Sequence, residues 1–169
     1  NNFKTKLVLL GTAAEYGIVK EKNLPLNEEH IPKPISSYGQ TKLMQTNFAL
    51  QSNSEDCPVI VLRPFNIYGP WMPNYLSISN FANQINQIKN NKNSGIQSLK
   101  VGNLHVERDF IFIKDFITML WDISSREEAY GEVYNACSGI PLSLLEIVEY
   151  MIDFSGTNLT IKQEKTRFR

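Results

Sequence analysis

A helix is predicted to begin within Ser36-Ser37-Tyr38-Gly39-Gln40-Thr41-Lys42, because the residues that follow, 43–51, contain neither glycine nor proline. Tyr38 and Lys42 are four residues apart, so they lie on one face of this helix, one turn from each other. The positive charge of the Lys42 ammonium stabilises the ionised form of the Tyr38 phenol. The pair therefore suits proton donation and acceptance, although the same spacing also occurs in helices that have no catalytic role.

Two continuous apolar runs flank this helix, Lys6–Leu10 before it and Pro58–Leu62 after it. Runs of this kind are typical of parallel strands that are buried on both faces. Small, polar and turn-forming residues follow each run, in the segments Gly11–Gly17 and Arg63–Pro70. Ligands of open α/β sheets bind beyond the carboxyl ends of the strands. Both segments are therefore predicted to lie at a functional edge of the sheet.

The rest of the chain continues the alternation of strands and helices. We expect helices at residues 76–88, 116–124 and 142–154, strands at 131–137 and 159–162, and two strands around a turn at 99–104 and 108–113. Ser143 and Glu146 form a capping-box pattern at the start of the last helix, and Gly156 is expected to end it. The alternation predicts an α/β fold with a largely parallel sheet. No glycine-rich turn of the form G-x-G-x-x-G is present in the sequence.

Composition limits the classes of function. The chain of 169 residues carries 17 basic and 17 acidic side chains, and its net charge of zero argues against nucleic acid or an anionic membrane as the main partner. No apolar run reaches the roughly 18 residues that span a bilayer. Cys57 and Cys137 are expected to be free thiols of a cytoplasmic protein, and no metal is expected at His30 or His105. Because the chain lacks an initial methionine and opens almost directly on a strand, we expect a fragment of a longer protein.

Six segments, in this order, resemble the extended short-chain dehydrogenase/reductase superfamily, whose NAD-dependent epimerases, dehydratases and reductases act on nucleotide sugars. They are Gly11–Gly17, Tyr38–Lys42, Arg63–Pro70, Val101–Leu104, Arg108–Phe110 and Val133–Gly139. Within the superfamily, the chain is most similar to the GDP-4-keto-6-deoxy-D-mannose reductases and GDP-mannose 4,6-dehydratases. The stretches that suggest this are Gly102–Leu104 ahead of Arg108–Phe110, Pro73–Ala82 and Arg167–Arg169.

The resemblance implies a fold and a set of roles. The fold would be the C-terminal portion of a Rossmann-like doubly wound parallel sheet, with a small α+β substrate-binding region at roughly residues 70–108 and 140–169. NAD or NADP would be the cofactor and a nucleotide-diphosphate sugar the substrate. The catalytic residues would be Thr12, Tyr38 and Lys42. Tyr38, Lys42, Pro64 and Phe65 would bind the cofactor, and Asn66, Arg108 and Arg169 the substrate.

One departure from the family pattern narrows the reaction. The 4,6-dehydratases carry an acidic residue two positions after the threonine, where it removes a proton during elimination, and this chain has Ala14 there. Glu15 is one position too far along. A 4-keto-6-deoxyhexose reductase is therefore favoured, with a nucleotide-sugar 4-epimerase as the alternative and a truncated, non-catalytic nucleotide-sugar-binding protein as the second.

Two further expectations follow from the resemblance. Without a glycine-rich half, the fragment itself is expected to bind the dinucleotide poorly and to be inactive. The exposed face of residues 43–51, with Met44, Gln45 and Phe48, would permit the full-length protein to form a homodimer.

Overall fold

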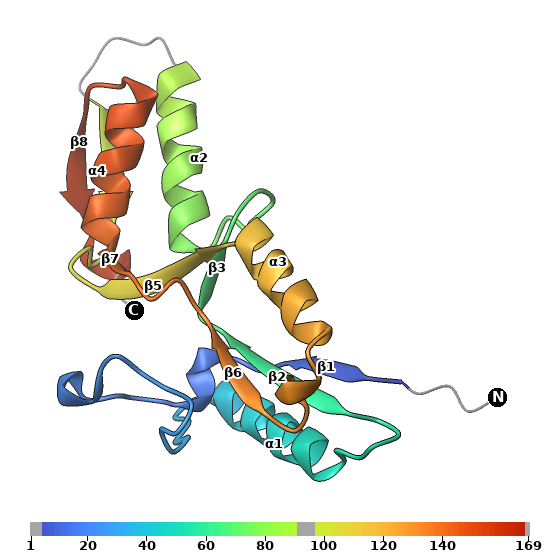
Figure 1. Ribbon diagram of the computed structural model, residues 1–169. Coiled ribbons are helices and arrows are strands. Elements are labelled where there is room, and N and C mark those ends of the chain that lie inside the picture. The colour runs from blue at the N-terminus through green and yellow to red at the C-terminus, as the bar shows by residue number, and fades with distance from the viewer. Residues whose placement is uncertain (1–4, 91–96, 168–169) are drawn as a thin grey trace. The chain divides into compact units, whose positions relative to one another are not determined.

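The computed structural model describes residues 5–90 and 97–167, and the chain divides into two compact units (Figure 1). The first unit consists of Asn1–Ile67 and Ile111–Gly139, and the second of Tyr68–Phe110 and Ile140–Arg169. Each unit has its own sheet and its own apolar core. The predicted α/β class is confirmed.

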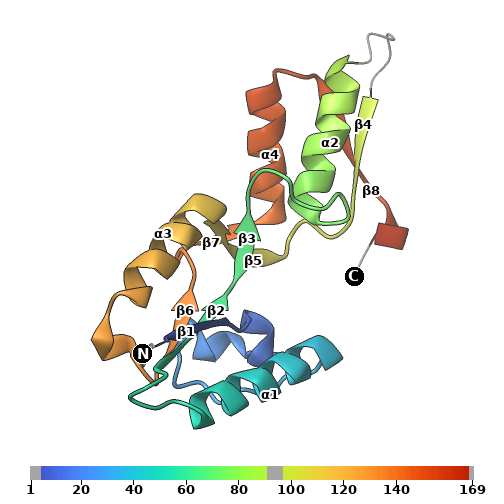
Figure 2. The ribbon, with the colours of Figure 1, turned by 90° about the vertical axis from the view of Figure 1, so that its right-hand side faces the viewer.

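The first unit is built on a parallel sheet with the strand order β1-β2-β6. Its strands are β1 (Leu7–Leu10), β2 (Val59–Pro64) and β6 (Val133–Ala136). Leu10 pairs with Leu62, and Pro64 pairs with Ala136, so the carboxyl ends of the three strands meet at one edge. The helices α1 (Ser37–Gln51) and α3 (Ile113–Ser124) lie on opposite sides of this sheet (Figures 1 and 2).

The central strand β2 is the most buried part of the first unit, with residues Val59 to Leu62 at most 1% exposed. Val59 and Val61 pack with Ala49 of α1, as expected for a strand covered on both faces. The prediction that the first strand is fully buried is wrong, because Leu7 is 41% and Leu10 39% exposed. The reason is its position: β1 pairs with β2 on one side, and in the described ranges no strand pairs with its other side.

The second unit packs two helices, α2 (Ser77–Asn90) and α4 (Leu144–Ser155), with two parallel strands, β4 (Gln97–Val101) and β8 (Leu159–Gln163). Six buried residues form its core: Phe81, Ile85, Leu99, Val101, Leu104 and Val148. The apolar periodicity of both helices is therefore core packing.

The predicted pair of strands around a turn is wrong in its pairing. The strand β4 pairs with β8, whereas β5 (Glu107–Phe112) pairs antiparallel with β7 (Pro141–Ser143). Closeness in sequence favoured a hairpin, but burial of Leu99 and Val101 in the core of α2 and α4 places β4 beside β8 instead. The short strands β7 and β3 (Asn66–Tyr68) were not predicted.

The end signals of the last helix are confirmed. The hydroxyl of Ser143 accepts a hydrogen bond from the amide of Glu146 at 3.1 Å, and the amide of Ser143 donates to Oε2 of Glu146 at 2.7 Å. Gly156 ends α4 in the left-handed conformation, with φ of 65°. Cys57 and Cys137 are not joined by a disulfide bond. Across the described ranges, none of the helices has the length and apolar character that a membrane span requires.

Candidate functional site

The helix α1 carries Tyr38 in its first turn and Lys42 in its second. Ser36 caps it, since its hydroxyl accepts a hydrogen bond from the amide of Gly39 at 3.1 Å. Gly39 also brings the helix close to the segment after β1: a Cβ at this position would lie 2.6 Å from the carbonyl oxygen of Ala14. The first turn of α1, with Tyr38, therefore lies directly beside that segment, and the Tyr38 side chain is 60% exposed.

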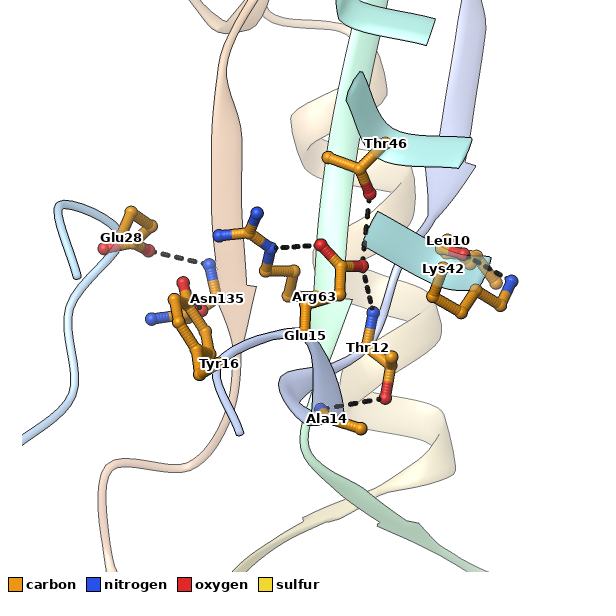
Figure 3. A network of polar contacts seen from close by, with 10 residues as sticks. All are labelled: Leu10, Thr12, Ala14, Glu15, Tyr16, Glu28, Lys42, Thr46, Arg63 and Asn135. Carbon is orange, nitrogen blue, oxygen red and sulfur yellow. Dashed lines mark hydrogen bonds and ion pairs between the residues drawn. The ribbon is translucent and has the colours of Figure 1, made fainter. Parts of the chain in front are cut away.

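Lys42 reaches from α1 to the carboxyl end of β1. Its ammonium donates a hydrogen bond to the carbonyl oxygen of Leu10 at 2.9 Å (Figure 3). It also donates to Oε1 of Gln45 at 3.2 Å. Leu10 is the last residue of β1 and lies two residues before Thr12. The structure thus brings Lys42 to the strand end that carries Thr12.

Thr12 caps a short 3-10 helix, η1 (Ala13–Glu15). Its hydroxyl accepts a hydrogen bond from the amide of Ala14 at 3.3 Å, and its own amide donates to Oε1 of Glu15 at 3.0 Å. This reciprocal arrangement is a capping box. A threonine hydroxyl that accepts one hydrogen bond still has its own proton to donate and a second lone pair.

Glu15 forms a buried polar cluster that the sequence interpretation missed (Figure 3). Its side chain is completely buried, and Oε2 accepts a hydrogen bond from Nε of Arg63 at 2.8 Å. Oε1 accepts from the hydroxyl of Thr46 at 3.1 Å and from the amide of Thr12 at 3.0 Å. The sequence does hold a signal, because Glu15 lies five residues after the first apolar run and Arg63 directly follows the second, and a buried charge needs a partner of opposite sign.

Tyr16 extends this cluster toward β6. Its hydroxyl donates to Oδ1 of Asn135 at 2.8 Å, and the Arg63 guanidinium carbon lies 4.7 Å from the centre of the Tyr16 ring. Burial raises the pKa of the Tyr16 phenol, an effect that the hydrogen bond and charge of Arg63 partly oppose. The amide of Asn135 donates to Oε1 of Glu28 at 2.7 Å, which ties the loop before α1 to β6.

The predicted cofactor-binding residues Pro64 and Phe65 lie at the same edge of the sheet. Pro64 ends β2, and the amide of Phe65 donates to the carbonyl oxygen of Ala136 at 3.0 Å. Both side chains are half-buried, and Asn66, which begins β3, is exposed. The structure therefore groups Thr12, Lys42, Pro64 and Phe65 at the carboxyl ends of β1 and β2.

One of the predicted substrate-binding arginines lies in a described part of the second unit. Arg108 belongs to the second unit, where it is exposed on β5 and donates from Nη1 to the carbonyl oxygen of Glu107 at 2.8 Å. Arg169 lies outside the described residues. Among those that are described, no group of three or more His, Cys, Asp or Glu side chains is arranged to hold a metal ion.

Comparison with known proteins gives relatives that are similar to nearly the whole chain. GDP-6-deoxy-D-mannose reductase of Pseudomonas aeruginosa is 35% identical over 170 residues, which cover 99% of this chain and 54% of the relative. GDP-6-deoxy-D-talose 4-dehydrogenase of Aggregatibacter actinomycetemcomitans is 27% identical over 98% of this chain and 52% of its own length. The chain thus spans about half the length of the curated relatives that it matches.

Solved structures agree with this comparison. RMD from Pseudomonas aeruginosa, complexed with NADPH, superposes with a TM-score of 0.89 at 32% identity, over 99% of this chain and 55% of that one. MoeE5 in complex with UDP-glucose and NAD has a TM-score of 0.79 over 96% of this chain and 52% of that one, and at 23% identity it supports the fold alone. Residues 1–137 match the sequence pattern of a family of NAD dependent epimerases and dehydratases. The chain belongs to the NAD dependent epimerase/dehydratase family.

Proposed function

We propose that the full-length protein is an NAD(P)-dependent reductase that converts a nucleotide-linked 4-keto-6-deoxyhexose, with GDP as the favoured nucleotide, into the 4-hydroxy sugar. GDP-6-deoxy-D-mannose reductase is the relative that supports this choice of substrate. The dinucleotide, when bound, supplies the hydride that adds to C4. Together with one proton, the ketone becomes an alcohol and the dinucleotide is oxidised.

The residues at the sheet edge suit a nicotinamide dinucleotide. Lys42 presents an ammonium at the end of β1 that would donate a hydrogen bond to a ribose hydroxyl, and Pro64 and Phe65 present half-buried apolar surface that would contact a nicotinamide ring. In this proposal, Tyr38 donates its phenolic proton to the oxygen at C4. Thr12 donates a second hydrogen bond to the same oxygen, and the Lys42 charge stabilises the phenolate that remains.

The observation that carries the choice of a reductase over a dehydratase is the burial of Glu15. Elimination of water from the sugar needs a base beside the threonine. Ala14 has only a methyl group, and the Glu15 carboxylate is completely buried and paired with Arg63 at 2.8 Å. A carboxylate in that position cannot reach a substrate at the sheet edge, so proton transfer by Tyr38 alone matches the residues present.

The second unit would hold the nucleotide. Arg108 is exposed on β5 and presents a planar guanidinium, a shape that suits phosphate oxygens. Asn66 would contact the sugar, and Arg169 would provide a second guanidinium for the diphosphate. Residues 70–108 and 140–169 would then form the substrate-binding region.

A homodimer of the full-length protein is also proposed. Met44 and Phe48 of α1 are 72% and 74% exposed, and an exposed apolar patch can mark a protein–protein interface. Size-exclusion chromatography with light scattering on the parent and on Met44→Lys/Phe48→Lys tests this. A dimer that both proteins keep would reject the α1 face as its interface.

The activity is tested by incubating the full-length protein with reduced dinucleotide and GDP-4-keto-6-deoxy-D-mannose. A reductase oxidises one dinucleotide for each sugar that it reduces. Product formation from a nucleotide sugar without net dinucleotide oxidation would instead identify a 4-epimerase. Nucleotide-sugar binding without either reaction would identify a non-catalytic binding protein.

A further inference from the structure

We infer that Glu15 is a positioning residue, which fixes the distance between Thr12 and the face of α1 that carries Tyr38 and Lys42. This inference rests on the proposed reductase function and assigns a role in it to a residue that touches neither cofactor nor substrate. Three elements meet at its carboxylate: the segment after β1, the helix α1 and the strand β2 (Figure 3).

One oxygen of Glu15 joins the backbone of Thr12 to the helix α1, which carries Tyr38. Oε1 accepts from the Thr12 amide at 3.0 Å and from the Thr46 hydroxyl at 3.1 Å. Thr46 is completely buried, as is Glu15, so no water competes for these hydrogen bonds. The backbone of Thr12 and the helix α1 are thus held through a single acceptor atom.

Thr46 lies on the same stripe of the helix as the reacting pair. Tyr38, Lys42 and Thr46 follow one another at intervals of four residues, and each such interval turns the helix only about 40° beyond one full turn. A hydrogen bond that holds Thr46 therefore sets both the rotation and the depth of this stripe relative to Thr12. The close contact between Gly39 and the Ala14 carbonyl keeps the other end of the stripe in place.

The neighbours of Glu15 restrict the position of its carboxylate. A Cβ at Gly11 would clash with Oε1, so a larger residue there would displace the carboxylate. Oε2 is held by Arg63 at 2.8 Å, and Arg63 is itself 4% exposed. The two oxygens therefore have separable tasks: Oε2 balances charge with Arg63, and Oε1 holds Thr12 and Thr46.

This separation allows a test that distinguishes positioning from stability. In the full-length protein, Glu15→Gln/Arg63→Met removes both charges but keeps an acceptor oxygen for Thr12 and Thr46. Glu15→Met/Arg63→Met removes the charges and the acceptor while keeping the length of the side chain. Met at position 63 also retains contact with the Tyr16 ring, since a thioether packs well on aromatic rings.

Two readouts are compared between these variants. The kcat of Glu15→Met/Arg63→Met is expected to be about 100-fold below that of Glu15→Gln/Arg63→Met, because a small misplacement of the reacting groups slows the chemical step. The KM for the dinucleotide is expected to change little. Amide hydrogen exchange in residues 11–17 and 37–46 is expected to be roughly tenfold faster in the variant without the acceptor. Equal kcat values, or equal exchange in these segments, would overturn the inference.

A failure of the proposed function would be recognised separately. If the parent reduces no nucleotide sugar, the reductase proposal is rejected, and hydrogen exchange alone decides whether Glu15 holds Thr12 to α1. If Glu15→Met/Arg63→Met does not fold, Thr46→Val and Thr46→Ser replace it. The valine variant is expected to lose at least roughly threefold in kcat and the serine variant, which keeps the hydroxyl, to retain it. Equal kcat in these two variants would likewise overturn the inference.

Discussion

The carboxylate of Glu15 lies 2.8 Å from Nε of Arg63, and the two side chains are 0% and 5% exposed. Arg63→Met alone would leave a buried carboxylate without its compensating charge, and we expect it to lower the free energy of unfolding by about 3–5 kcal/mol. Adding Glu15→Gln should recover most of this loss, because the uncompensated charge disappears. Urea unfolding of the full-length protein and these variants measures both effects.

The control for this prediction is an exposed ion pair. Lys100 is 52% exposed and lies 3.7 Å from Glu164. Lys100→Met is expected to change stability by no more than about 1 kcal/mol. If Arg63→Met lowered the free energy of unfolding by no more than Lys100→Met does, burial would not make the Glu15–Arg63 pair more important for stability than an exposed pair.

Gly39→Ala should destabilise the protein, although alanine is ordinarily the better helix former by about 1 kcal/mol. The added Cβ would lie 2.6 Å from the Ala14 carbonyl oxygen and 3.0 Å from Cβ of Pro34. Overpacking against backbone costs about 1–3 kcal/mol, so a net loss is expected. Gln40→Ala, at the exposed neighbouring position, is the control and should stay within about 0.5 kcal/mol. Thermal unfolding that shows a more stable Gly39→Ala variant would contradict this packing.

Tyr16 is expected to make the free energy of unfolding fall as the pH rises in the alkaline range. Burial raises the pKa of its phenol above 10.0, so its contribution to stability is complete below pH 10 and is lost as the pH rises through the folded-state pKa. At neutral pH, Tyr16→Phe should be less stable than the parent, because it loses the hydrogen bond to Asn135. The difference in free energy of unfolding between the parent and Tyr16→Phe should then become smaller as the pH rises.

Urea unfolding at pH 8 and at higher pH values measures this change. Tyr150→Phe, at a tyrosine that is 70% exposed, serves as the control. Its pH dependence should follow that of the parent. A difference between the parent and Tyr16→Phe that stays constant across the pH range would contradict the buried, hydrogen-bonded phenol.

The capping box of α4 gives a prediction at the acidic end of the pH range. Ser143→Ala should cost about 1 kcal/mol at neutral pH. Hydrogen bonds from the side chain and backbone of Ser143 lower the pKa of the Glu146 carboxyl below 4.5. The stability that the ionised Glu146 carboxylate contributes through these hydrogen bonds is present above pH 4.5, and it is lost as the pH falls through the folded-state pKa. The difference between parent and variant in urea unfolding should therefore be smaller at pH 3 than at pH 7, and an equal difference at both would contradict it.

Much of the first unit could be predicted from local sequence. The parallel strands β1 and β2 were visible as continuous apolar runs, and α1 as a segment free of glycine and proline. The spacing of Tyr38 and Lys42 is also local, because it follows from the helix period alone. In the second unit, the capping box at Ser143 was likewise predicted from a local spacing, that of Ser143 and Glu146.

What the sequence could not predict depends on pairs of residues that are far apart in the chain. Glu15 and Arg63 are 48 residues apart, and Tyr16 and Asn135 are 119 apart. No periodicity links such residues, so their hydrogen bonds emerge only when the strands align. The pairing of β4 with β8 is of the same kind, since burial in a distant core decided it.

The replacement of Tyr38 by phenylalanine in the full-length protein tests the central claim most directly. This change removes one oxygen atom from a side chain that is 60% exposed, so the fold should be preserved. We predict that turnover of GDP-4-keto-6-deoxy-D-mannose falls by about 10²–10⁴-fold while the Kd of the reduced dinucleotide is unchanged. Tyr150→Phe should keep the parent rate. A Tyr38→Phe variant that turns over at a near-normal rate would contradict proton donation by Tyr38.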